Sequence, residues 1–336
     1  MKRKTRPKAR PRMRARAIAR ANIALSKYWG KVDTTYNLPA VPSLSLTLDG
    51  LVTDTTVEFV EGLAEDRLEL DGRAASPKET KRVTTMLDRV RASAGVPFKA
   101  LVTSVNKFPT ASGLASSASG FAALAAASTA ALGLDYPEAK LSNLARWSSA
   151  SAGRSIFGGF AELPAGKPGQ KTLSAKPVAD ADHWDVRIVV AVTAQGPKDV
   201  GSTEGMERSR STSPFYDAWV ERAPGIHATV KRGVKKRDLD AVGPAMEQST
   251  FAFHSCGLTA IPPIVYFQPA TLAALATVRR LRDAGIPVYA TMDAGPHVKA
   301  LCLAADAPKV KRALEKTEGV LRTIVAKPGP GVEVRA

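Results

Sequence analysis

The first third of the chain shows the alternation of apolar and polar positions that β-strands produce. The segment at 16–25 has a strand-like alternation, and shorter apolar runs at 44–50, 53–61 and 67–72 are separated by Asp or Gly. Another run of this kind covers 98–106. We expect these segments to form consecutive strands of an antiparallel sheet.

Helical patterns lie between and after these strands. A helix is predicted over 77–95, because Ser76 and the proline after it are typical of a helix start and Gly95 of a helix end. Two more helices are predicted over the alanine-rich residues 121–133 and over 137–153.

A second set of elements follows a stretch rich in Pro, Gly and Lys at 164–177. It opens with a buried strand and continues as helices 213–233, 238–256 and 269–285 and strands 288–293 and 298–305. Helices and strands alternate in both halves, which favours an α+β protein with two domains that share a cleft. We place these domains at 15–184 and 185–336.

The charge of the chain is concentrated at its start. The formal net charge is +17, and residues 1–20 contain ten Lys and Arg and no acid, which leaves +7 for the rest. We expect residues 1–14 to be a disordered basic arm, since they hold too few large apolar side chains to fold alone. A nucleic-acid-binding protein is the alternative from another class, but no aromatic and basic surface motif supports it.

Other features of the composition narrow the class of protein. Cys256 and Cys302 are far apart, so neither a disulfide framework nor a zinc site is indicated, and the four histidines have no metal-ligand spacing. No stretch reaches the roughly 18 apolar residues of a membrane span, and no secretory signal is recognisable. We therefore expect a cytoplasmic protein that does not bind a membrane.

The segment FPTASGLASSASG at 108–120 connects a predicted strand to a predicted helix. Small residues at a helix start let a phosphate approach unpaired backbone N–H groups, and Ser116 and Ser117 could add hydroxyls for the phosphate or its Mg²⁺ ion. Tight helix packing or a flexible linker would need small residues too. The segment is neither a Walker A loop nor G-x-G-x-x-G. Taken alone, it leaves these alternatives open.

Five motifs, in a fixed order, are similar to one known family. The segment 109–118, PTASGLASSA, resembles the phosphate-binding motif of the GHMP kinase superfamily. Within that superfamily four segments resemble the diphosphomevalonate decarboxylases: NIALSKYWGK at 22–31, ASAGRSIFGGF at 150–160, DVGSTEGM at 199–206 and MDAGP at 292–296. The resemblance extends from about residue 16 to about residue 303.

The resemblance implies a fold and a reaction. The expected fold has an N-terminal ribosomal-protein-S5-like domain and a C-terminal ferredoxin-like domain, with the active site between them. The expected reaction uses ATP and Mg²⁺ to phosphorylate the 3-hydroxyl of mevalonate 5-diphosphate, after which phosphate and CO2 leave and isopentenyl diphosphate remains. It belongs to the mevalonate pathway of isoprenoid biosynthesis, and the family is commonly dimeric.

The resemblance also assigns catalytic roles. Asp293 matches the carboxylate that orients the tertiary hydroxyl and takes its proton, although Asp-Ala-Gly-Pro is also good turn chemistry. Lys27 matches a lysine that stabilises the leaving phosphate, and Arg154 matches the arginine that holds the substrate carboxylate. A lysine at a strand end is otherwise only a solvated charge.

Further residues match binding positions of the family. The expected substrate-binding residues are Tyr28, Lys31, Ser149, Ser151, Arg154, Thr203 and Met206. The expected nucleotide-binding residues are Asn106, Ser112, Gly113, Leu114, Ala115, Ser116 and Ser117, and Ser117 is also the expected protein ligand of Mg²⁺.

The chain departs from the family pattern near the substrate. Residues 149–154 read SASAGR where the family has SGSACR, residues 41–45 read VPSLS where many relatives have NSSLS, and His297 replaces a common Asn. These changes leave two rivals open: a decarboxylase of mevalonate 5-phosphate, and a kinase that phosphorylates the 3-hydroxyl without decarboxylation.

Overall fold

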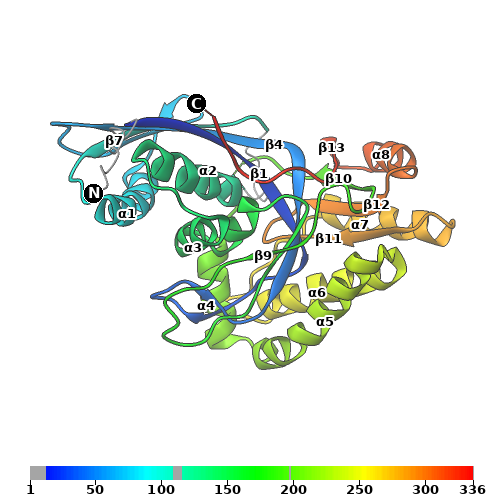
Figure 1. The fold of residues 1–336 in the computed structure, drawn as a ribbon. Coiled ribbons are helices and arrows are strands. Elements are labelled where there is room, and N and C mark those ends of the chain that lie inside the picture. Colours follow the sequence, from blue (N-terminus) through cyan, green and yellow to red (C-terminus); the bar gives the residue numbers. More distant parts are fainter. Residues whose placement is uncertain (1–12, 109–115, 197, 336) are drawn as a thin grey trace, which may run out of the picture.

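The computed structural model describes residues 13–108, 116–196 and 198–335, and these form a mixed α+β fold with two domains (Figure 1). Strand β1 (Arg14–Ser26) begins at the last residue of the predicted arm, the rest of which, apart from Met13, lies outside the described residues.

The N-terminal domain is built on one large sheet. Its strands run in the order β14-β1-β4-β7-β5-β6, and β8 and β9 extend it from β4. They are β4 (Ser43–Val60), β5 (Arg67–Leu70), β6 (Arg73–Ala74), β7 (Lys99–Asn106), β8 (Phe160–Leu163), β9 (Lys176–Ala179) and β14 (Glu333–Arg335). Against this sheet pack α1 (Pro77–Ala94), α2 (Ser116–Ala131), α3 (Glu138–Ser148) and the 3₁₀ segment η1 (Ala150–Ile156).

The C-terminal domain has a second sheet, in the order β11-β12-β10-β13. Its strands are β10 (Val186–Val192), β11 (Val288–Thr291), β12 (Val298–Leu303) and β13 (Arg322–Ala326). Helices α5 (Tyr216–Lys236) and α6 (Leu239–Leu258) pack on one face of it, and α7 (Pro269–Asp283) and α8 (Ala307–Glu315) on the other. Helix α4 (Ser202–Thr212) and the short pair β2 (Lys31–Asp33) and β3 (Leu38–Pro39) lie beside the junction of the domains.

Strands β1 and β4 join the two domains. The first half of β1 packs its alanines against α2, whereas Ile23 and Leu25 of the second half pack against the C-terminal domain, where Val230 of α5 and Met246 of α6 join the same core. All four side chains are fully buried, and each burial stabilises the fold by about 2 kcal/mol. Because β1 runs from one core into the other, the residue after its end, Lys27, lies between the domains.

The prediction of two strands at 44–50 and 53–61 was wrong. The residues form one continuous strand, β4, which pairs with β1 on both sides of Gly50. Gly50 has a φ of +88°, and the register shifts between Arg20 and Asn22 of the partner strand. The Asp-Gly pair therefore bends the strand at a bulge and does not reverse it.

The chain also returns to its first sheet at the end. Strand β14 pairs with β1, with Arg335 opposite Arg16, so these last residues belong to the N-terminal sheet although they lie beyond the predicted boundary at 184. The edge of β1 is open to such pairing, which no local pattern could reveal.

The predicted helix at 77–95 is confirmed in detail. Ser76 and Glu79 form a capping box, and Gly95 ends the helix with a φ of 70°. Helix α4 was missed, because its residues are mostly polar and only Gly205, Met206 and Ser209 are buried.

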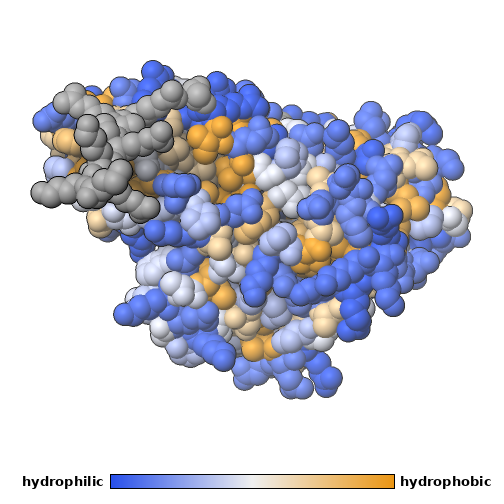
Figure 2. Space-filling view, in the orientation of Figure 1, coloured by the Kyte–Doolittle hydropathy of each residue, from blue (hydrophilic) through white to orange (hydrophobic). Residues whose placement is uncertain are grey.

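Hydrophilic side chains cover most of the face shown in Figure 2, with smaller hydrophobic areas between them. Among the described residues, no helix has both the length and the apolar character needed to cross a bilayer.

Candidate active site

A cleft of about 1460 Å³ lies between the two domains. The N-terminal domain contributes the end of β1, the start of α2 and the segment around η1, and the C-terminal domain contributes α4 and the loop between β11 and β12. The cleft brings together the following expected site residues: Lys27, Tyr28, Lys31, Ser116, Ser117, Ser149, Ser151, Arg154, Thr203, Met206 and Asp293. Ser112, Gly113, Leu114 and Ala115 lie outside the described residues.

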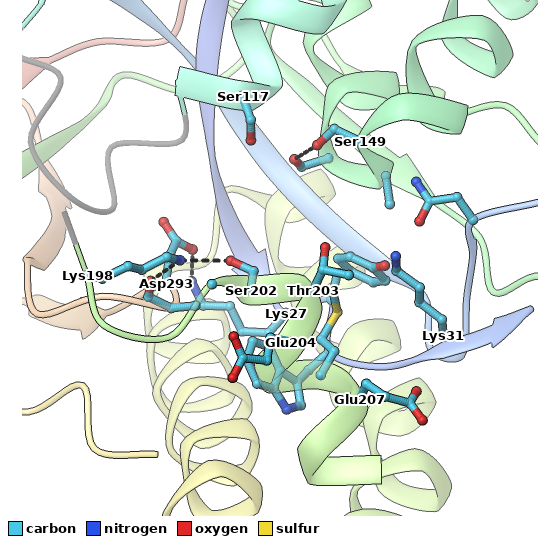
Figure 3. A pocket seen from close by; sticks show the side chains of 18 of the residues that line it. Lys27, Lys31, Ser117, Ser149, Lys198, Ser202, Thr203, Glu204, Glu207 and Asp293 are labelled. Atoms are coloured by element: carbon cyan, nitrogen blue, oxygen red, sulfur yellow. Dashed lines mark hydrogen bonds and ion pairs between the residues drawn. The ribbon is translucent and has the colours of Figure 1, made fainter. Parts of the chain in front are cut away.

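Asp293 is held by two lysines, one on each oxygen. Lys27 Nζ donates to Oδ1 at 2.8 Å, and Lys299 Nζ lies 3.2 Å from Oδ2. Burial alone would raise the pKa of Asp293, but the two ammonium groups outweigh it and hold the pKa well below the usual range of a carboxyl group. The side chain is 24% exposed, so this anion faces the cleft, as Figure 3 shows.

Lys27 is almost completely buried, and burial lowers the pKa of its ammonium group to about 8 although Asp293 opposes the shift. Its backbone N–H donates to the hydroxyl of Ser249 on α6 at 2.9 Å. Lys27 is thus fixed by two contacts to the C-terminal domain, one to Ser249 on α6 and one to Asp293 in the loop between β11 and β12. Because the pKa of Lys27 is about 8, a ligand that binds beside it can change whether its side chain carries a proton.

Arg154 is a buried cation without a carboxylate partner among the described residues. Its guanidinium donates to Ser45 Oγ at 2.8 Å, to Ser43 Oγ at 2.6 Å and to Asn22 Oδ1 at 3.4 Å, and burial lowers its pKa to about 10. Neutral acceptors orient the group but leave its charge uncompensated. An anionic ligand in the cleft would supply the missing charge.

The structure explains two departures from the family pattern. The change at 41–45 leaves both serines that orient Arg154 in place. Gly153 packs against Ser142 of α3, where an added Cβ would come within 3.1 Å of the Ser142 carbonyl oxygen. The relocated glycine therefore lets η1 approach α3 closely, and the arginine keeps its position.

The part of the cleft lined by Tyr28, Lys31 and the start of α4 is suited to an anion. Helix α4 starts after Gly201 without a side-chain cap, so its first N–H groups have no partner within the helix. The Tyr28 hydroxyl is buried and has no hydrogen-bond partner among the residues that the structure describes, and burial raises its pKa. Lys31 lies nearby, and burial, followed by the charge of Arg82, lowers its pKa.

A second cavity of about 210 Å³ opens beside the start of α2. Its walls include apolar side chains, among them Leu68, Val83, Val102, Phe121 and Leu124, and it shares Arg82, Ser116 and Ser117 with the main cleft. Asn106 lines this smaller cavity, where its side chain donates to Asp71 and accepts from the Thr53 hydroxyl. An apolar slot that opens onto a helix N-terminus suits a nucleotide, with the base inside and the phosphates at the amides.

The sequence reasoning missed two lysines around Asp293. Lys198 donates to the Ala294 carbonyl at 2.7 Å and to Ser202 Oγ at 2.9 Å, and burial lowers its pKa to about 8. The sequence feature that could have identified Lys198 is its position directly before the family-like motif at 199–206. Lys299 is 0% exposed, and its signal was a lysine inside an otherwise apolar strand.

His254 and His297 are not among the residues that line the cleft. Both are buried, and burial lowers their pKa values to about 3 and about 4, so both imidazoles are neutral. No group of three or more His, Cys, Asp or Glu able to hold a metal occurs in the described part of the chain. A Mg²⁺ ion in this cleft would therefore be held mainly by phosphates and water, and the Ser117 hydroxyl lines the cleft as a further oxygen ligand.

Comparisons with known proteins agree with this geometry. The diphosphomevalonate decarboxylase-like N-terminal domain matches residues 19–174, and the mevalonate 5-diphosphate decarboxylase C-terminal domain matches residues 188–325. The diphosphomevalonate decarboxylase of Homo sapiens is 36% identical over 83% of this chain and 74% of its own. The chain belongs to the diphosphomevalonate decarboxylase family.

Solved structures of the family superpose along 96% of this chain. A structure of MDDEF in complex with MVAPP, AMPPCP and magnesium is 41% identical, covers 96% of this chain and 99% of its own, and gives a TM-score of 0.90. Mevalonate diphosphate decarboxylase from Staphylococcus aureus is 36% identical, covers 96% and 98%, and gives 0.91. The protein therefore has the GHMP-kinase type of fold and is an ATP-dependent decarboxylase.

Proposed function

We propose that this protein converts mevalonate 5-diphosphate and ATP to isopentenyl diphosphate, ADP, phosphate and CO2. The γ-phosphoryl group goes to the 3-hydroxyl, and phosphate and CO2 then leave with formation of the double bond. One observation carries the proposal: Asp293 and the uncompensated Arg154, from different domains, line a single cleft that extends to the start of α2.

Asp293 would orient the tertiary hydroxyl and accept its proton. A carboxylate with so low a pKa is a weak base, but phosphoryl transfer passes through a loose transition state in which the nucleophile needs little activation. Its main contribution is then to aim the hydroxyl oxygen. Lys27, beside it, would stabilise the negative charge that develops on the transferred and later departing phosphate.

Arg154 would hold the substrate carboxylate. Its fork is fixed by Ser43, Ser45 and Asn22, so the two carboxylate oxygens would be bound in one orientation before the carbon–carbon bond breaks. As CO2 leaves, the bonding electron pair forms the double bond while the 3-phosphate departs with the electrons of its carbon–oxygen bond. The charges of Arg154 and Lys27 thus serve opposite ends of one elimination.

The remaining cleft residues would hold the diphosphate and the nucleotide. For the substrate we propose the hydroxyls of Ser149 and Ser151, and for its diphosphate end Tyr28, Lys31, Thr203 and Met206, the last two on the first turns of α4. For ATP we propose Asn106 and the start of α2 with Ser116 and Ser117, together with 112–115. Mg²⁺, when bound with ATP, neutralises phosphate charge, and Ser117 is its proposed protein contact.

Product analysis tests the function directly. Purified protein is incubated with ATP, Mg²⁺ and mevalonate 5-diphosphate, and ADP, CO2 and isopentenyl diphosphate are quantified, with mevalonate 5-phosphate in a parallel reaction. We expect the three products in equal amounts and faster turnover of the diphosphate. ADP without CO2 would make the protein a 3-kinase, and preference for the monophosphate would reassign the substrate.

We also propose that the protein is a cytoplasmic homodimer. The dimer rests on the family resemblance alone, and the mass in solution by light scattering tests it. Cys256 and Cys302 are buried free thiols, which is compatible with a reducing compartment. A monomeric mass would remove the dimer from the proposal and leave the chemistry unchanged.

A further inference from the structure

Lys299 is a fully buried lysine, the second residue of β12. Its neighbours in the strand are apolar, and its exposed fraction is 0%. A lysine in such a place costs stability unless a carboxylate compensates it, and the carboxylate that does so is the one in the cleft. Lys299 Nζ lies 3.2 Å from Oδ2 of Asp293.

The hairpin places Lys299 behind the loop that carries Asp293. Thr291 pairs with Lys299 across β11 and β12, so the loop between them begins and ends beside this ammonium group. Lys27 contacts the other oxygen and lines the cleft, whereas Lys299 is not among the residues that line it. Lys299 therefore stays outside the cleft and reaches it through its ion pair with Asp293.

We propose that Lys299 is a positioning residue for the phosphoryl-transfer step. It keeps Oδ2 of Asp293 in place and its charge compensated, which allows Lys27 to release Oδ1 and turn to the phosphoryl group. This inference rests on the proposed function. Without Lys299, Oδ2 would lose its ion-pair partner, the pKa of Asp293 would rise as Lys27 turns to the phosphoryl group, and the carboxylate would accept the hydrogen of the substrate hydroxyl less well.

Several other groups act on Asp293 and must be considered in any pH experiment. Besides the two lysines on its oxygens, these are Lys198 from the loop before α4, Arg154 from η1, His254 from α6 and His297 from the same hairpin. Both histidines are neutral above about pH 5, and the other three cations remain when Lys299 is replaced. Only Lys299 contacts Oδ2 among the ion pairs of the described residues.

The test compares Lys299→Met with Lys309→Met, which removes an exposed lysine from α8 as a charge-matched control. We expect Lys299→Met to lower kcat about 10-fold or more, to leave the KM values for ATP and substrate within about 3-fold, and to move the acid limb of the kcat–pH profile to higher pH. Lys299→Arg should restore part of kcat. Unchanged kcat and an unchanged acid limb in Lys299→Met would overturn the proposal.

A double-mutant cycle with Asp293→Asn separates positioning from a merely structural role. In the Asp293→Asn background, Lys299→Met should cause no further loss of turnover, and the thermal midpoints of the four proteins should be non-additive. This second readout holds even if Lys299→Met alone folds poorly. Additive midpoints would refute the pairing whatever the activity, whereas an inactive wild-type protein with non-additive midpoints would refute the proposed function instead.

Discussion

Replacement of Asp293 by Asn is the most informative change in the cleft. The variant keeps the shape of the side chain but removes the anion that Lys27 Nζ meets at 2.8 Å and Lys299 Nζ at 3.2 Å. A positioned acid–base group contributes about 10²–10⁴-fold to a rate. We take about 10³-fold, or about 4 kcal/mol of transition-state stabilisation, because the low pKa of Asp293 makes it a weak base and leaves mainly its orienting effect.

The same change should destabilise the fold. The ammonium groups of Lys27 and Lys299 lose their common counter-ion. Removing one partner of a buried ion pair costs about 3–5 kcal/mol of stability when the remaining partner keeps its charge. Lys27, whose pKa is about 8 even beside the carboxylate, will instead lose its proton more easily. Its pKa in the folded state lies below the unfolded value, so the unfolded chain binds more protons and stability rises with pH. The deficit should therefore be largest below the further lowered pKa of Lys27 in the variant and shrink as the pH rises toward 8, where Lys27 of the wild type also loses its proton.

The assay measures ADP and CO2 release together with ATP affinity. ATP should bind Asp293→Asn within about 3-fold of wild type, since the apolar slot and the start of α2 do not contact Asp293. Turnover within 10-fold of wild type would refute the assignment of the acid. Loss of ATP binding in a folded variant would refute the assignment of ATP to the smaller cavity and the start of α2.

Three further changes test other parts of the structure. Arg154→Lys keeps the charge but not the fork, so the KM for the substrate should rise about 30-fold or more with the KM for ATP unchanged, as steady-state kinetics would reveal. The pKa of Glu162 is lowered to about 2, first by its hydrogen bond to the imidazole of His227 on α5. Glu162 should therefore contribute about 2 kcal/mol of stability that is present above pH 4.5 and lost as the pH falls toward 2. Thermal melts of Glu162→Gln against wild type over that range should converge, and a pH-independent difference would contradict this linkage. Gly30→Ala should unfold at a clearly lower temperature, since Gly30 has a φ of +105° and a Cβ would overlap the Tyr216 hydroxyl, whereas Gly225→Ala, with open space around it, should be neutral or stabilising.

Much of the fold was predictable because its signals are local. The helix at 77–95 has its cap residues beside it in the chain, and the strand at 16–25 has its alternation within ten residues. Where a contact distant in sequence decided the structure, prediction failed. Asp49-Gly50 resembles a turn, and only continuous pairing with β1 makes it a bulge. The polar helix α4 forms where the cleft and the aromatic residues behind it accept its buried side.

The candidate site divides in the same way. Residue types and their order along the chain indicated the chemistry: small residues before a helix for a phosphate, and an acid, a lysine and an arginine in motifs that resemble one family and follow its order. Only the tertiary structure decided that Lys27, Arg154 and Asp293 share one cleft, and that Lys299 stands behind the acid. The physical reason is the distance along the chain over which each interaction acts. Backbone propensity and capping act over a few residues, whereas the charge that compensates a buried carboxylate comes from whatever strand the fold places beside it.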